Sequence, residues 1–276
     1  MYSYVTYLGS DSYLVGVLAL NAQLKKFKSK YPLTVITSMI GEHTKYILKK
    51  NKINFIEMGY NIKLSDKIKE ENKNYGMPQW NNTFGKLSVF GLTQFKKIVY
   101  LDSDMLIREN IDELFKKPNL SSVISGTKYP GNESWSKTLN SGLMVLVPKY
   151  GEDKRLISIL EDVENYESLG DQDIIHMGYP KWSVKLNLGE EFNLMLHHEA
   201  YYLAKKIVKH STVKVVHFTG KEKPWMITNS QLVYFSLRLL KNSVKVNKSL
   251  KGIIPTFDDY FTYFKICKEV KKGLGK

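Results

Sequence analysis

Strand-like and helix-like patterns alternate over the first part of the chain, and this alternation restricts the fold more than any other sequence feature. Short β-rich runs lie at residues 3–8, 33–38 and 53–58, and amphipathic stretches at 13–27 and 43–50 separate them. A β-α-β-α-β order requires right-handed crossovers, which place the strands in a parallel sheet with helices on both faces. The sequence therefore predicts an α/β protein with a Rossmann-like half.

The rest of the chain continues this mixture without an internal repeat or a linker rich in Gly, Pro or Ser. We expect further strands at residues 97–101, 121–127, 141–148 and 212–220, and helices at 80–95, 153–166, 229–241 and from Asp171 onward. These elements predict one α/β domain over residues 1–241 with an additional lobe. A basic, aromatic tail over residues 242–276 is expected to pack on the same domain.

Two aspartates directly follow the strand expected at residues 97–101, in the segment YLDSDMLI. Ligands of open α/β sheets bind outside the carboxyl ends of the strands, where Asp102 lies. If the backbone bends at Ser103, Asp102 and Asp104 reach one site and offer oxygen ligands to a divalent cation, which would also explain two buried charges. The alternative is a strand-to-turn junction whose aspartates accept backbone hydrogen bonds.

Two further segments bring polar side chains to the same edge. In VVHFTGKEKPW a strand ends at His217, whose imidazole could be a third metal ligand, while Gly220 permits a close backbone approach and Lys223 can reach phosphate oxygens. The alternative is a core histidine followed by a surface turn. In LGDQDIIH, Asp171 is either a helix N-cap or presents, with Gln172, a carboxylate and an amide to a substrate.

The charge balance favours anionic partners, because 41 Lys and Arg residues against 27 Asp and Glu residues give a net charge of +14. The lysines are dispersed, and no motif combines basic with stacking residues, so we expect no nucleic-acid partner. Nucleotide phosphates fit the charge, and so does an anionic membrane surface touched by the tail. A bias of the coding sequence would produce the same composition.

Cysteine usage and hydropathy indicate the compartment. Cys267 is the single cysteine, which excludes an internal disulfide and a cysteine-based metal site. The apolar run at residues 13–20 is much shorter than the roughly 20 residues of a membrane helix, and the first residues lack the basic region of a signal peptide. We therefore expect a cytoplasmic protein, in the host cytoplasm if the gene is viral.

Four segments in this order, YLDSDMLI, LNSGLMVLVP, LGDQDIIH and VVHFTGKEKPW, resemble the glycogenin-type members of glycosyltransferase family 8. The similarity extends from Tyr4 to about Trp225 and includes NIDELF after the two aspartates. It implies a GT-A fold with a mixed central sheet and an acceptor-side lobe. It also implies retaining transfer of a hexose from a UDP-sugar, with Mn²⁺ as the metal and Mg²⁺ as the alternative.

The resemblance further implies a role for individual positions. It assigns the metal to Asp102, Asp104 and His217, and it places Asp171 and Gln172 beside the anomeric carbon as the catalytic pair. Donor binding involves the metal ligands and further residues, namely Tyr7, Leu8, Gly9, Ser10, Tyr13, Lys86, Ser103, Asn140, Ser141, Gly220 and Lys223.

Two positions depart from the family pattern. Met77 stands where glycogenins carry an arginine before a proline, and Ser168 stands where they carry an aspartate that helps to bind the donor sugar. The donor hexose, glucose or galactose, therefore stays open. A catalytically silent UDP-sugar-binding protein is the alternative to an enzyme.

The acceptor is expected to be a separate glycan or protein. Glycogenins glycosylate a tyrosine of their own, and a gapless alignment back from His217 puts Ala200 at that position, followed by Tyr201 and Tyr202. Alanine has no hydroxyl that could attack the sugar. Self-glycosylation on a neighbouring tyrosine is the alternative, and a homodimer is one assembly that the resemblance allows.

Overall fold

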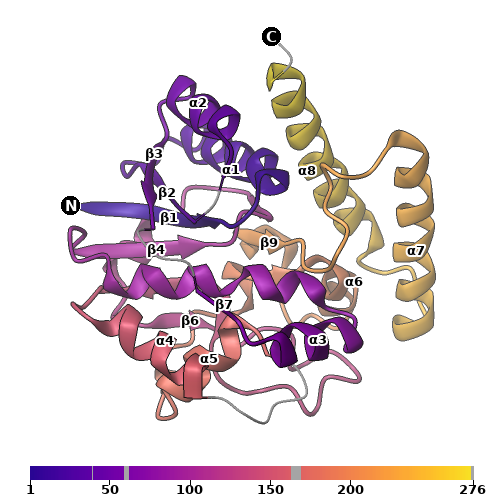
Figure 1. Ribbon diagram of the computed structural model, residues 1–276. Coiled ribbons are helices and arrows are strands. Elements are labelled where there is room, and N and C mark those ends of the chain that lie inside the picture. Colours follow the sequence, from indigo (N-terminus) through magenta and orange to yellow (C-terminus); the bar gives the residue numbers. More distant parts are fainter. Residues whose placement is uncertain (39, 59–61, 163–168, 275–276) are drawn as a thin grey trace.

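A six-stranded mixed sheet forms the centre of the computed structural model, which describes residues 1–38, 40–58, 62–162 and 169–274. Its strands, in the spatial order β3-β2-β1-β4-β7-β6, are β1 (Tyr2–Leu8), β2 (Leu33–Thr37), β3 (Asn54–Glu57), β4 (Lys97–Leu101), β6 (Ser121–Val123) and β7 (Asn140–Leu146) (Figure 1). The pairs among β3, β2, β1 and β4 are parallel, whereas β7 runs antiparallel to β4 and β6. The parallel part confirms the predicted Rossmann-like order.

Side chains of the sheet alternate between two cores on its opposite faces. In β4, Val99 and Leu101 pack in one hydrophobic cluster and Ile98 and Tyr100 in the other, as the two-residue period of a strand requires. The first face is covered by α1 (Leu14–Lys26) and α2 (Glu42–Lys50) (Figure 1). The second face is covered by α3 (Asp66–Asn74), the 3₁₀ helix η3 (Phe84–Gly91), α4 (Glu152–Asp162) and α5 (Asp171–Gly178).

A second, small sheet and the last three helices form the additional lobe. The sheet has the order β5-β9-β8, with β5 (Met105–Ile107), β8 (Leu194–Met195) and β9 (Val215–His217). The helices are α6 (Leu196–Ala204), α7 (Asn229–Asn247) and α8 (Ile253–Leu274), of which α7 and α8 lie side by side at one flank of the molecule (Figure 1). Across the described parts of the chain, no helix combines the length and apolar composition that a bilayer crossing demands.

The basic tail is helical and packs inward. Tyr260, Tyr263 and Cys267 of α8 are buried in the same cluster as Val216 and Trp225, whereas Phe261 is exposed. The expected limit between residues 241 and 242 lies inside α7. The aromatic side chains of the tail are thus divided between the core and the surface.

Several stretches differ from the sequence-based expectations, among them residues 121–127, of which only Ser121–Val123 (β6) forms a strand. Residues 80–95 form η2 (Pro78–Asn82) and η3 rather than one regular helix, and Gly85 lets η3 pass under Tyr7, because a Cβ there would lie 2.2 Å from Tyr7 Cζ. The strand expected at 212–220 is only β9. The helix expected at 153–166 is α4, and residues 163–166 lie outside the described residues, as does Ser168. The remaining 3₁₀ helices are η1 (Asp11–Tyr13), η4 (Asp112–Lys116), η5 (Val184–Leu186), η6 (Glu190–Phe192) and η7 (His210–Thr212).

Candidate active site

The turn that follows β4 joins the two sheets and carries both aspartates. Asp102 donates its backbone N–H to the carbonyl of Gly142 (2.8 Å), and the carbonyl of Asp104 accepts a hydrogen bond from Phe218 N (2.9 Å). The next strand, β5, pairs with β9 so that Met105 lies opposite His217. This pairing brings a histidine that is more than 100 residues away in sequence beside the aspartates.

Asp102, Asp104 and His217 form a group that we call the strand-edge cluster. One potential ligand atom from each residue lies within 4.8 Å of the other two. His217 Nε2 is 3.2 Å from Asp104 Oδ1 and 3.8 Å from Asp102 Oδ2. Asp104 and His217 are buried, while the Asp102 side chain is 24% exposed, so the cluster opens to solvent on the Asp102 side.

Hydrogen bonds behind the cluster fix the tautomer of His217. Asn140 Oδ1 accepts from Gly142 N (3.0 Å) and from Asn193 Nδ2 (2.7 Å), which identifies Asn193 Oδ1 as the acceptor for His217 Nδ1 (2.9 Å). Nδ1 therefore carries a proton, and Nε2 is the ring nitrogen that faces the two carboxylates. Two carboxylate oxygens with one imidazole nitrogen fit a divalent metal ion, which would bind Nε2 in the place of a proton.

Each carboxylate of the cluster also has a lysine partner. Lys86 Nζ lies 3.0 Å from Asp102 Oδ1, and Lys223 Nζ lies 2.5 Å from Asp104 Oδ2. Both lysines are buried, and this corrects the reasoning that buried charge at Asp102 and Asp104 by itself calls for a metal. The fit to a metal rests on the His217 tautomer and the convergence of the ligand atoms.

The pKa shifts follow from burial and from these pairs. Burial raises the pKa of Asp102, and Lys86 offsets this only in part. Burial acts in the same direction on Asp104, but Lys223 and His217 outweigh it and hold the pKa of Asp104 well below its ordinary value. Burial would lower the pKa of Lys86, yet the charges of Asp102 and Asp171 leave that pKa raised. The lysines are thus charged and the Asp104 carboxyl is ionised.

Asp171 and Gln172 lie at the start of α5, next to the first residues of β7. The N-cap of α5 is Gly170, and Asp173 accepts from the Gly170 N–H (2.8 Å), so the N-cap interpretation of Asp171 is wrong. Asp171 Oδ2 instead accepts from Ser141 Oγ (2.7 Å) and pairs with Lys86 (2.8 Å). Gln172 Oε1 accepts from Ser141 N (3.1 Å). Lys86 therefore bridges the catalytic candidate to Asp102.

In the loop after β1, Tyr13 is the residue whose contacts link it to the strand-edge cluster. Tyr13 packs edge-on against Trp225 at 5.6 Å between ring centroids. Burial raises the pKa of Tyr13, and the nearby charge of Lys223 offsets part of this rise. Leu8 has its side chain in the core, so only its backbone is available to a ligand. Tyr7 contacts Ser38 through its hydroxyl (3.1 Å). The other two residues of the loop are partly exposed, namely Gly9 and Ser10, the latter capping η1.

Two further positions of the sequence motifs, Gly220 and Met77, lie near the site. Gly220 has φ +107°, a left-handed conformation that favours glycine, and a Cβ there would meet open space. This leaves its backbone accessible beside Lys223. Met77 precedes η2, and its sulfur accepts a hydrogen bond from Gln79 Nε2 at 3.2 Å. The nearby charge comes from Lys221, whose ammonium lies 3.6 Å from the place of a Cβ on the neighbouring Gly76.

Two residues of the site were not identified from the sequence. Tyr100 donates its hydroxyl to Asp102 Oδ1 (2.8 Å), and the strand period offered a signal, since it lies two residues before Asp102. Asn193 orients His217 from a segment between two short 3₁₀ and strand elements, where no pattern marks it.

Comparison with known proteins gives a family match over most of the chain. The family model described as "Glycosyl transferase family 8" matches residues 4–228. An uncharacterized protein of Acanthamoeba polyphaga mimivirus is 31% identical over 247 residues, covering 83% of this chain and 84% of that protein. Human glycogenin-1 is 27% identical over 235 residues, covering 82% of this chain but only 63% of glycogenin-1.

A solved structure shares the fold. The galactosyltransferase LgtC, crystallised with donor and acceptor sugar analogs, superimposes with a TM-score of 0.53 at 16% identity, covering 89% of this chain and 96% of LgtC. At this identity the similarity bears on the fold alone. The chain has the GT-A fold with a mixed central sheet, as expected from the sequence.

Proposed function

The chain belongs to glycosyl transferase family 8, and on this basis we propose that it is a retaining transferase that moves a hexose, glucose or galactose, from a UDP-sugar to a separate glycan or protein. The observation that supports this most is the strand-edge cluster, in which three potential ligand atoms converge and His217 is oriented through Nδ1 so that Nε2 faces the two aspartates. The cytoplasm is the proposed location.

The cluster suits a metal that accepts both oxygen and nitrogen ligands. Mn²⁺ is the proposed ion and Mg²⁺ the alternative, because Mg²⁺ binds oxygen ligands almost exclusively and His217 supplies nitrogen. Held by Asp102, Asp104 and His217, the ion would supply positive charge to the diphosphate of the donor. The partly exposed Asp102 marks the side from which the diphosphate would approach.

Lys223 is proposed to stabilise the departing UDP. Its ammonium already lies in the cluster and is held by Asp104 Oδ2 and by the carbonyl of Phe218 (3.0 Å). A preorganised charge of this kind needs little rearrangement when negative charge develops on the leaving phosphate. The accessible backbone at Gly220 and the ring of Tyr13 would complete the diphosphate and uridine side of the site.

The sugar is proposed to lie against Asn140, Ser141, Asp171 and Gln172. Asp171 receives two donors on one oxygen, and Lys86 foremost among the charges keeps its pKa low despite burial. A carboxylate stabilised in this way is a weak nucleophile, which favours front-face attack over a covalent intermediate on Asp171. The acceptor oxygen would then bond to the anomeric carbon as the bond to UDP breaks, and its proton would pass to the departing phosphate.

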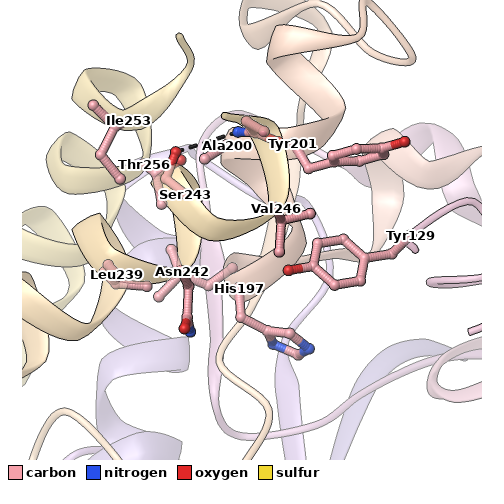
Figure 2. A pocket seen from close by; sticks show the side chains of 12 residues that line it. Tyr129, His197, Ala200, Tyr201, Leu239, Asn242, Ser243, Val246, Ile253 and Thr256 are labelled. Atoms are coloured by element: carbon pink, nitrogen blue, oxygen red, sulfur yellow. Dashed lines mark hydrogen bonds between the residues drawn. The ribbon is translucent and has the colours of Figure 1, made fainter. Parts of the chain in front are cut away.

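A separate acceptor is proposed because Ala200 lies in a closed environment. It belongs to α6 and borders a narrow pocket between α6, α7 and α8 (Figure 2). A Cβ at Gly252 would lie only 2.4 Å from the Ala200 carbonyl, so the connection between α7 and α8 covers it directly. Tyr202 is fully buried with its hydroxyl on Glu190 Oε1 (3.1 Å), and Tyr201 is half-buried beside Tyr129.

The proposal is tested by measuring UDP release and intact mass together. Purified protein is incubated with a panel of UDP-sugars, with Mn²⁺, with Mg²⁺ or with excess chelator. We expect release from UDP-glucose or UDP-galactose with Mn²⁺ and a marked loss with chelator. Undiminished release in chelator contradicts the metal, and no release or UDP binding under any condition contradicts the enzyme. A ladder of hexoses on the protein itself, lost in Tyr201→Phe, would replace the separate acceptor by self-transfer.

A further inference from the structure

Hydrogen bonds from three directions hold the backbone of the turn Asp102–Asp104. Two were described above, from Gly142 to Asp102 and from Phe218 to Asp104. The third comes from α8, where the hydroxyl of Tyr263 donates to the carbonyl of Ser103 at 3.0 Å. This carbonyl belongs to the same rigid peptide plane as the N–H of Asp104, so its partner restricts the direction in which the Asp104 side chain leaves the backbone.

Tyr263 is placed deep in the lobe for this contact. Its side chain is completely buried, and its ring packs on Phe218 at 4.5 Å and on Trp225 at 6.4 Å between centroids. Burial raises the pKa of Tyr263 well above its ordinary value, so the hydroxyl is protonated and donates. A buried hydroxyl and a buried carbonyl would each be costly without the other.

Close packing leaves the Ser103 carbonyl no room to turn away. A Cβ at Gly16 in α1 would lie 2.7 Å from that oxygen and 2.7 Å from Trp225 Cη2. Glycine within a helix is unfavourable, so its presence here agrees with a close approach of α1 to the turn. The turn is therefore enclosed by α1, Trp225 and α8, and only α8 offers a hydrogen bond to its middle residue among the contacts described.

We propose that Tyr263 is a positioning residue that fixes the turn of the two aspartates, and that α8 thereby forms part of the active-site support. The family match ends at residue 228, so this support comes from outside the segment that defines the family. The inference rests on the proposed function for its effect on turnover. Its effect on the turn itself does not depend on any reaction.

The test compares Tyr263→Phe with Tyr260→Phe. Both changes remove one hydroxyl from a buried tyrosine of α8, and Tyr260 stacks on Phe218 one turn before Tyr263. Hydrogen exchange of the ligand-free protein is measured at the amides of residues 102–105. We expect faster exchange in Tyr263→Phe than in Tyr260→Phe, at melting temperatures that allow both variants to be compared as folded proteins.

Binding and turnover give the second readout. In the presence of Mn²⁺, calorimetry should show UDP binding about fivefold weaker in Tyr263→Phe, as for the loss of one hydrogen bond, and kcat should fall at least about tenfold with little change in Tyr260→Phe. Faster exchange in a protein whose wild type neither binds nor turns over UDP-sugars would reject the proposed function alone. Unchanged exchange, or equal losses in both variants, would overturn the role of Tyr263.

Discussion

Two groups in this molecule each contain two carboxylates and one histidine, but they differ in their electrostatics. The strand-edge cluster contains two aspartates and a histidine, and a second group of Glu199, His210 and Asp259, here called the helix cluster, contains two carboxylates and a histidine on α6, η7 and α8. In both, one potential ligand atom per residue lies within 4.8 Å of the others. Composition and proximity therefore do not separate a metal site from another kind of cluster.

The hydrogen bond on the far side of each imidazole separates them. His217 Nδ1 donates to Asn193 Oδ1, which leaves Nε2 free for a metal. His210 Nδ1 faces Arg108 Nη2 at 3.2 Å, and because a guanidinium only donates, this Nδ1 must accept. The proton of His210 is then on Nε2, where it blocks a metal and points toward Asp259 Oδ2 at 3.7 Å.

The carboxylates of the helix cluster also differ in how they are neutralised. Glu199 is fully buried and both of its carboxylate oxygens are without a hydrogen-bond partner, while Asp259 lies 3.5 Å from the Arg108 guanidinium. Lysines accompany both aspartates of the strand-edge cluster. The arrangement favours a protonated Glu199, so a proton has the place that a metal is proposed to take in the other cluster.

The largest difference between the clusters should be in catalysis. Asp104→Asn keeps the shape of the side chain but removes a charged ligand, and we expect turnover to fall at least about 10²-fold, as metal affinity does when such sites are perturbed. Asparagine is preferable to alanine, because alanine would leave the buried Lys223 with the Phe218 carbonyl but no polar side chain at position 104. Glu199→Gln is the matched change in the helix cluster and should keep turnover within about threefold. Equal losses in both variants would remove the distinction.

Lys223 supplies the next largest effect. Lys223→Met keeps the length and burial of the side chain but removes the charge proposed to stabilise departing UDP, and we expect a loss of about 10²-fold in kcat. Lys214→Met is the control, since Lys214 pairs with Glu109 and Glu113 at the surface beside β9. A loss below about threefold in Lys223→Met would reduce Lys223 to a structural partner of Asp104.

Metal binding tests the tautomer argument directly. Titration of Mn²⁺ followed by electron paramagnetic resonance should detect one tight ion per chain in the presence of UDP. His217→Gln should weaken that binding by about tenfold or more, whereas His210→Gln should leave it unchanged. Two ions per chain, with one lost in each variant, would show that the helix cluster binds metal and that the hydrogen bond of Arg108 does not decide the tautomer.

The sequence predicts the scaffold of the site better than its electrostatics. The alternation of strands and helices predicts the parallel half of the sheet, and the position of Asp102 after a buried strand predicts the edge where His217 and Asp171 gather. These features depend on periodicity and on strand ends, which are local. The GT-A fold and its mixed sheet came from the resemblance of several motifs taken together.

Features that depend on distant partners were out of reach. Asn193 and Tyr263 contact the site from elements whose sequences carry no polar motif, and the helix cluster is assembled from three segments that give no common signal. An aspartate at a helix start is typical of an N-cap, but the preceding Gly170 has the N-cap conformation, and the Asp171 carboxylate pairs with Lys86 instead. Contacts between segments far apart in sequence thus determine the roles of these side chains, and local sequence propensity does not reveal such contacts.

The smallest predicted effect concerns stability and its dependence on pH. Burial first, and the charge of Asp259 second, raise the pKa of Glu199 well above its ordinary value, while Arg108 acts in the opposite direction. The folded state therefore keeps a proton that the unfolded state releases once the pH exceeds the ordinary pKa of a glutamate. The free energy of unfolding must fall as the pH rises from there toward the folded pKa. Glu199→Gln imitates the protonated form and removes this loss.

We therefore expect Glu199→Gln to melt about 2–5 °C above the wild type at pH 8, the shift for roughly 1–2 kcal/mol in a chain of this size, and the gap to shrink toward pH 5.5. Burial lowers the pKa of His210, and of His197 and His198 to about 4 and about 2, so these residues destabilise both proteins alike at acid pH and cancel in the difference. The charges of Asp259 and Asp258 offset only part of this lowering at His210, and both aspartates are unchanged in the variant. Calorimetric melting at several pH values measures the gap. A gap independent of pH, or a variant that becomes less stable than the wild type as the pH rises, would mean that Glu199 is ionised in the folded protein, and the helix cluster would then need a cation just as the strand-edge cluster does.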